Sequence, residues 1–139
     1  MPETSGGLPA NLIRGASHHG FKAMQIGASA LAAEALKLTL PAASFSRSTE
    51  SHNQDKVSMG TLAARDALRV VELGESVAAI VLLAGCQALE LREASAPPRL
   101  AALLAGVRAE VPAVDADRRQ DLDIARVLAM HRRGALPVA

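Results

Sequence analysis

The stretch Val77–Cys86, VAAIVLLAGC, is an unbroken run of apolar and small residues and decides the fold of this chain. It lies within residues 56–92, which contain no proline and repeat apolar residues at helical spacing. A helix of that length would extend roughly 54 Å, whereas a compact globule of 139 residues is about 37 Å across. The sequence therefore predicts one long helix that overhangs its own chain and has a middle buried on every side.

The composition around this run indicates helices throughout. Hydrophobic residues make up 50% of the chain and aromatic residues 1%. The apolar residues are therefore mostly Ala, Leu and Val; Ala and Leu are strong helix formers, and Ala lets helices approach closely. We predict an all-α fold: a helical bundle with one long central helix, which forms part of a larger oligomeric helical fold.

Charge and composition exclude several classes of function. The net charge of +1 is too small for a nucleic-acid-binding surface, and without Trp or Tyr the chain lacks the aromatic side chains on which bases usually stack. We therefore expect no nucleic-acid partner. The apolar run is shorter than the roughly 20 residues that span a bilayer, and the N-terminus has no signal-peptide pattern. Cys86, the single cysteine, lies in the apolar run, so we expect a reduced core thiol in a cytoplasmic protein without membrane contact.

The chain reads as one unit with five consecutive parts. We predict an irregular lead-in over residues 1–17, a helix over 18–40 and a polar connection over 41–55. The long helix follows over 56–93, and a set of short C-terminal helices over 99–139. The first helix repeats apolar residues every three or four positions, which places on one face Phe21, Met24, Ala28, Leu31, Ala35 and Leu38.

Turn and capping residues predict where these helices begin and end. Pro41 should end the first helix, and either Asp55 or Ser58 should cap the long one. The last helix should begin near Asp117 or Gln120, and Gly134 stands at its stop position.

The polar connection and its flanks contain the most unusual residues of the chain. Its core, STESHNQDKVSMG at Ser48–Gly60, is densely polar in a chain that is half hydrophobic, which suits either a solvated loop or a site for a polar ligand. Four stretches together resemble the aromatic amino acid ammonia-lyase family, which includes histidine, phenylalanine and tyrosine ammonia-lyases and related aminomutases. They are GLPANL at Gly7–Leu12, GFKAMQI at Gly20–Ile26, ESHNQDKVSMGTLAARD at Glu50–Asp66 and LLAGCQALELR at Leu82–Arg92.

The resemblance covers nearly the whole chain and implies a C-terminal segment of such an enzyme. Members of this family are all-α tetramers whose active sites are shared between subunits. Their electrophile is a methylidene-imidazolone made from an internal Ala-Ser-Gly, and their catalytic base is a tyrosine. This chain has neither Ala-Ser-Gly nor any tyrosine. We therefore expect no cofactor in this chain, no lyase turnover by the chain alone, and a homo-oligomer or an N-terminal lyase fragment as partner.

The resemblance also implies roles for five residues. Gln54 stands where phenylalanine- and tyrosine-type members carry Gln and histidine-type members carry Glu, and Glu50 stands near the substrate amine or the leaving ammonia. These two are the predicted catalytic residues. Lys22, Ile26 and Asn53 are the predicted substrate-binding residues, and Lys22 could pair with Glu50.

Without the resemblance, the same residues have ordinary structural explanations. Glu50 and Lys22 would be solvated surface charges. Asn53 and Gln54 would be turn residues, and Ile26 would belong to the core.

We therefore predict the C-terminal part of a lyase that eliminates ammonia from phenylalanine- or tyrosine-type amino acids to give a cinnamate-type product. Two alternatives remain. One is a segment of a histidine ammonia-lyase, which forms urocanate. The other is a vestigial helical oligomerisation module without catalysis, which the missing electrophile and tyrosine favour.

Overall fold

The computed structural model describes residues 6–15, 17–54, 56–93 and 95–137. Its elements are two short 3₁₀ turns and four α-helices: η1 (Ala10–Leu12), α1 (Lys22–Lys37), η2 (Ala42–Phe45), α2 (Gly60–Leu91), α3 (Pro98–Arg108) and α4 (Asp121–Arg132). The described ranges contain no strand, only an isolated bridge between Thr49 and Gln54. The all-α prediction is confirmed.

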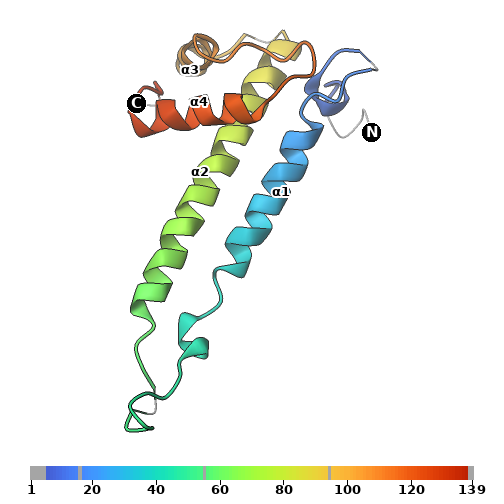
Figure 1. The fold of residues 1–139 in the computed structure, drawn as a ribbon. Helices are drawn as coiled ribbons and strands as arrows, with labels where there is room; N and C mark the ends of the chain where they lie inside the picture. Colours follow the sequence, from blue (N-terminus) through green and yellow to red (C-terminus); the bar gives the residue numbers. More distant parts are fainter. Residues whose placement is uncertain (1–5, 16, 55, 94, 138–139) are drawn as a thin grey trace.

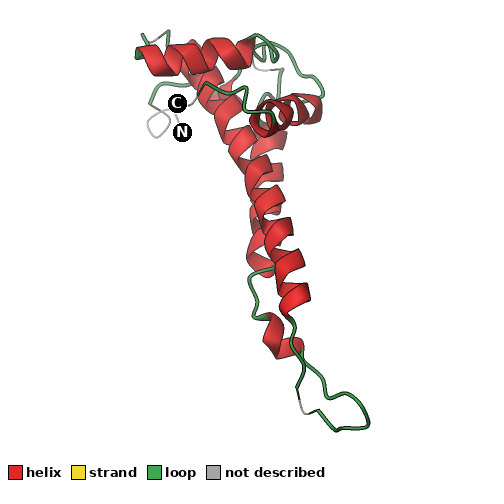
Figure 2. Cartoon of the chain, turned by 90° about the vertical axis from the view of Figure 1, so that its left-hand side faces the viewer, coloured by secondary structure: helices red, strands yellow, loops and turns green. Residues whose placement is uncertain are grey.

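The two longer helices form an antiparallel hairpin that extends away from the rest of the molecule (Figure 1). α2 has 32 residues and is therefore about 48 Å long. α3 and α4 pack near its C-terminal end, and the connection between α1 and α2 lies at the opposite tip (Figures 1 and 2). The predicted overhang is thus present. None of the helices in the described ranges is both long and apolar enough to cross a membrane.

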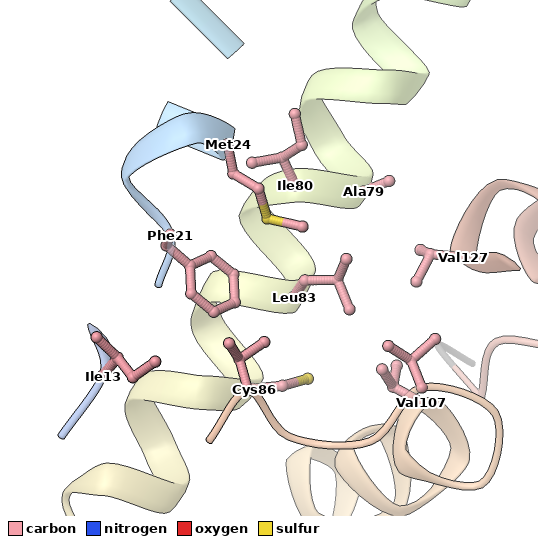
Figure 3. Close-up of a cluster of buried hydrophobic side chains, with 11 residues drawn as sticks. Ile13, Phe21, Met24, Ala79, Ile80, Leu83, Cys86, Val107 and Val127 are labelled. Carbon is pink, nitrogen blue, oxygen red and sulfur yellow. The ribbon is translucent and has the colours of Figure 1, made fainter. Parts of the chain in front are cut away.

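The hydrophobic core lies at the end of the hairpin that α3 and α4 cover. Figure 3 shows Phe21, which precedes α1, and Met24 of α1 directed toward Leu83 and Cys86 of α2, with Val107 and Val127 on the other side. The predicted stripe of α1 accounts for its share of the core, because Phe21 and Met24 are buried and Ala28 and Leu31 pack against the cluster. The buried thiol is also confirmed.

The prediction that Val77–Cys86 is buried on every side is wrong for this chain alone. Ile80 and Leu83 are 5% and 2% exposed, whereas Val81 is 62% exposed. α1 covers one face of α2, and α3 and α4 cover others near its end. The remaining face of α2, which includes Val81, is left largely exposed by the described residues.

The first two helices begin later than predicted, because the backbone just ahead of each helix is held in other contacts or in a non-helical conformation. Gly20 has φ +49°, outside the right-handed helical region, so α1 begins at Lys22 rather than near residue 18. The backbone N–H and C=O of Val57 both bond to Ser46 Oγ, at 2.9 and 2.8 Å, so α2 begins at Gly60 rather than near residue 56.

The predicted capping residues are only partly confirmed. α1 ends at Lys37, ahead of Pro41. Ser58 Oγ accepts the backbone N–H of Gly60 at 3.3 Å, although Met59 occupies the N-cap position of α2, and the other candidate, Asp55, lies outside the described residues. Gly134 follows α4 with φ +67°, as its stop position predicts.

Candidate functional site

The polar loop between η2 and α2, residues 46–58, is fixed at its base and exposed at its tip. Ser46 is 5% exposed, and its hydroxyl joins the two ends of the loop through Val57. Nearer the tip, the backbones of Thr49 and Gln54 exchange hydrogen bonds of 3.0 and 3.3 Å, and the Thr49 hydroxyl donates to Gln54 Oε1 at 3.1 Å. The loop is therefore a closed hairpin rather than an open connection.

The tip of this loop is a left-handed turn. Three consecutive residues, Glu50, Ser51 and His52, have φ values of 51°, 54° and 67°. Non-glycine residues avoid this region, at a cost of roughly 1–2 kcal/mol each. The Asn53 N–H donates to the Glu50 carbonyl at 3.0 Å, which closes the turn. As a result, the side chains of Glu50, Asn53 and Gln54 are exposed at the far end of the molecule.

Lys22 and Ile26 lie at the other end of the hairpin, on the first turns of α1 (Figure 1). Both side chains are exposed, Ile26 at 57%, so the explanation of Ile26 as a core residue is wrong for this chain. Within the described ranges, no ion pair joins Lys22 and Glu50. The structure therefore brings Glu50, Asn53 and Gln54 together and separates them from the other two residues.

Five cavities lie along the helices, and their linings include none of the five predicted site residues. A mostly apolar cavity of about 460 Å³ between the lead-in, α2 and α3 has Leu8, Cys86 and Arg92 in its lining. Another, of about 560 Å³, lies between α1, α2 and α4. Since none of these five cavities adjoins Glu50 or Gln54 in the described part of the chain, other protein would complete a pocket at the loop.

A different set of polar contacts fixes the start of α1. The Asp117 carboxylate accepts the backbone N–H of His19 at 2.9 and 3.0 Å and that of Gly20 at 2.9 Å, and it lies 3.3 Å from His19 Nδ1. Hydrogen bonds from the backbone of His19 and then of Gly20 lower the pKa of the Asp117 carboxyl. On the other side of this corner, the Phe21 N–H donates to the Asn11 carbonyl at 2.9 Å.

Gln87 connects the lead-in to the segment before α4. Its side chain is buried; Nε2 donates to the Leu12 carbonyl at 3.1 Å and to the Val114 carbonyl at 2.8 Å, and Oε1 accepts the Val114 N–H at 3.0 Å. The sequence predicts no role for Gln87, and it offers Asp117 only as a possible start of the last helix. The available signal for Gln87 was its position as an amide directly after the apolar run.

No group of three His, Cys, Asp or Glu side chains in the described ranges could hold a metal ion. The thiol of Cys86 is a second candidate for reactivity, and it is buried. Burial raises the pKa of the Cys86 thiol, which suits an inert core position rather than a nucleophile.

Comparisons of the sequence and of the fold with known proteins point to one family. The sequence model of the family described as aromatic amino acid lyase matches residues 1–111. A tyrosine ammonia-lyase of Cupriavidus metallidurans is 41% identical over 119 residues, which are 84% of this chain and 22% of that protein. A histidine ammonia-lyase of Koribacter versatilis is 39% identical and aligns with 99% of this chain and 27% of its own length.

Solved structures agree. The crystal structure of histidine ammonia-lyase from Trypanosoma cruzi matches with a TM-score of 0.88 at 36% identity, over 98% of this chain and 27% of that one. Tyrosine aminomutase from Streptomyces globisporus matches with a TM-score of 0.87 at 34% identity, over 97% and 26%. The chain thus spans about a quarter of the length of these relatives. Because the family model covers most of the sequence and the helices superimpose on solved members, the chain belongs to the aromatic amino acid lyase family.

Proposed function

We propose that this chain is the C-terminal part of an aromatic amino acid ammonia-lyase that acts in the cytoplasm on phenylalanine- or tyrosine-type substrates. The observation that carries the proposal is the polar loop. Its base is fixed by the buried Ser46, while Glu50, Asn53 and Gln54 are exposed on a closed turn. Residues fixed in this way are suited to form one wall of a pocket that other protein completes.

The chain's own side chains would bind and orient the substrate. The Glu50 carboxylate would stabilise an ammonium group, and the neutral Gln54 amide would lie beside an uncharged ring. Ile26 would supply an apolar contact from a different part of the chain. The electrophile would be a methylidene-imidazolone formed from an Ala-Ser-Gly outside this chain, and when bound it would activate the substrate for loss of the β-proton.

The separation of the two groups of residues supports an assembled site. Lys22 and Ile26 lie in the first turns of α1, at one end of the hairpin, and Glu50 and Gln54 lie in the connection between α1 and α2, at the opposite end (Figure 1). If both groups contact the same substrate, they come from different copies of the chain, and a homo-oligomer combined with an N-terminal lyase fragment provides them.

The first experiment is complementation. The chain is mixed with an N-terminal lyase fragment that carries Ala-Ser-Gly, and cinnamate or coumarate formation is followed by absorbance. We expect turnover only in the mixture, and a strong loss of turnover with Glu50→Gln. Glu93→Gln is the matched control, because Glu93 is an exposed carboxylate paired with Arg14 at 3.1 Å, away from the loop. A mixture that forms no product with a competent fragment contradicts the proposal.

The choice of substrate is tested at Gln54. Histidine ammonia-lyases are among the similar relatives, so histidine is the second candidate substrate. A carboxylate suits an imidazole ring better than an amide does. We therefore expect Gln54→Glu to lower turnover of phenylalanine or tyrosine and to raise that of histidine. Turnover of histidine by the unsubstituted mixture, unchanged by Gln54→Glu, would assign the chain to the histidine type.

A non-catalytic oligomerisation module is the second candidate function. It is favoured by large apolar side chains that α1 and α2 leave exposed, among them Leu36, Leu68, Val71 and Val81. Mass measurement in solution separates the two functions. A stable homo-oligomer that never increases the activity of a lyase fragment would support the module.

A further inference from the structure

The corner that precedes α1 is constructed from three segments that are distant in the sequence. Gly20 adopts φ +49°, and a Cβ at this position would lie 2.5 Å from the Asn11 carbonyl oxygen. The Asn11 carbonyl accepts the Phe21 N–H, and Asp117 accepts the N–H groups of His19 and Gly20. The predicted substrate-contacting residue Lys22 follows directly as the first residue of α1.

Asp117 holds the backbone that leads into the helix, through the N–H groups of His19 and Gly20. The N-cap residue of α1 is Phe21, which has no side chain able to cap, and the first turn contains no acidic residue. Its carboxylate bonds to residues just ahead of the helix rather than to the helix's own N–H groups, and a negative charge near this end is favoured by the helix dipole. Here that carboxylate comes from 97 residues away. It therefore fixes the start of α1 relative to the C-terminal segment.

Asp117 is in turn held by its own segment. The neighbouring Arg118 donates to the carbonyls of Pro112 and Ala113, at 2.7 and 2.8 Å, and to the buried Asp123 at 3.0 Å. Val114 is fixed by Gln87. This segment lies beyond residues 1–111, to which the family model matches.

We propose that Asp117 is a positioning residue for the predicted site: it sets the orientation of the first turn of α1 and thereby the place of Lys22 and Ile26. This inference rests on the proposed function for the role of those two residues. The position of the turn itself can be measured without any activity.

The test compares Asp117→Ala and Asp117→Asn in the 139-residue chain by NMR. In Asp117→Ala we expect the amide protons of His19 and Gly20 to exchange roughly tenfold faster, the change that fits loss of a hydrogen bond to a partly exposed charged acceptor. The amide shifts of Lys22 and Ile26 should move with them. Asp117→Asn keeps one acceptor oxygen and should restore part of the protection.

Asp115→Ala is the matched control. Asp115 is an exposed carboxylate of the same segment and has no hydrogen bond or ion pair within the described ranges. Its variant should leave the exchange rates and the shifts at their original values. Unchanged exchange at His19 and Gly20 in Asp117→Ala, or unmoved shifts at Lys22, would overturn the proposal.

The complementation assay adds the kinetic consequence. A positioning role predicts that Asp117→Ala raises KM several-fold with kcat nearly unchanged, and that Asp117→Asn recovers part of the difference. A general loss of folded protein would instead lower the apparent kcat without changing KM, which counts against positioning. Failure of the unsubstituted mixture to turn over refutes the proposed function, while the NMR result still decides whether Asp117 orients the first turn of α1.

Discussion

Replacing Gln87 should destabilise the chain more than any change at an exposed amide. The side chain is 4% exposed and makes three hydrogen bonds to backbone groups of Leu12 and Val114. Gln87→Met keeps a similar volume, so it removes these bonds with little change in packing. At a net value of about 1 kcal/mol per hydrogen bond, the loss in the free energy of unfolding is roughly 3 kcal/mol. That is a large part of the roughly 5–15 kcal/mol that stabilises an ordinary domain.

Urea unfolding is the suitable assay. The chain has no Trp or Tyr, so helix content is followed by circular dichroism at 222 nm rather than by fluorescence. With a slope of about 2 kcal/mol per molar urea, the midpoint should fall by roughly 1.5 M. The control is Gln25→Met, because the Gln25 side chain is exposed and, among the described residues, bonds only to Ser29 on its own helix, at 3.2 Å. We expect that control to lie within about 0.5 kcal/mol of the unsubstituted chain.

The refuting result is equally specific. If Gln87→Met and Gln25→Met unfold at the same urea concentration, the backbone groups of Leu12 and Val114 find other partners. The buried amide would then not be what joins the lead-in to the C-terminal segment.

Three further predictions concern single positions. Gly20→Ala should lower the melting temperature markedly, because φ at this position is +49° and the added Cβ would lie 2.5 Å from a backbone oxygen. Gly27→Ala should instead stabilise α1 by roughly 0.5–1 kcal/mol, because nothing lies within 4 Å of the added carbon, and thermal melts of both variants check this. Hydrogen bonds from the backbone of His19 lower the pKa of the Asp117 carboxyl, so its contribution to stability is complete above the unfolded pKa of about 3.9 and is lost as the pH falls through the lower folded pKa. In unfolding curves from pH 7 to pH 2, the free energies of unfolding of Asp117→Asn and of the unsubstituted chain should therefore become equal only at the acid end. A difference in free energy that stays constant over this pH range would contradict the prediction. Burial raises the pKa of the Cys86 thiol, so a thiol reagent at pH 8 should label it slowly in the native chain and rapidly in urea; rapid native labelling would contradict its burial.

The sequence predicted the helices well because helix formation depends on near neighbours. The spacing of Phe21, Met24 and Leu31 identified the face of α1 that the structure buries. The stretch without proline predicted a long second helix, and Gly134 marked the end of the last one. The same local patterns carried the resemblance to the lyase family.

The boundaries that the sequence missed were decided by contacts outside the helices. The start of α2 depends on Ser46, which bonds to both backbone groups of Val57 across the loop. The start of α1 depends on Gly20 and on Asp117, which are 97 residues apart. Helical periodicity contains no information about such partners.

The sequence by itself determined the helical class, the apolar stripe of α1 and the polar character of the loop, because these follow from the order of side chains along the chain. Only the tertiary structure decided which face of α2 remains uncovered at Val81, that Lys22 and Glu50 lie at opposite ends of one hairpin, and that Gln87 and Asp117 join the lead-in to the C-terminal segment. Burial and long-range hydrogen bonds depend on the positions of residues far apart in the sequence, and those positions exist only once the helices have packed.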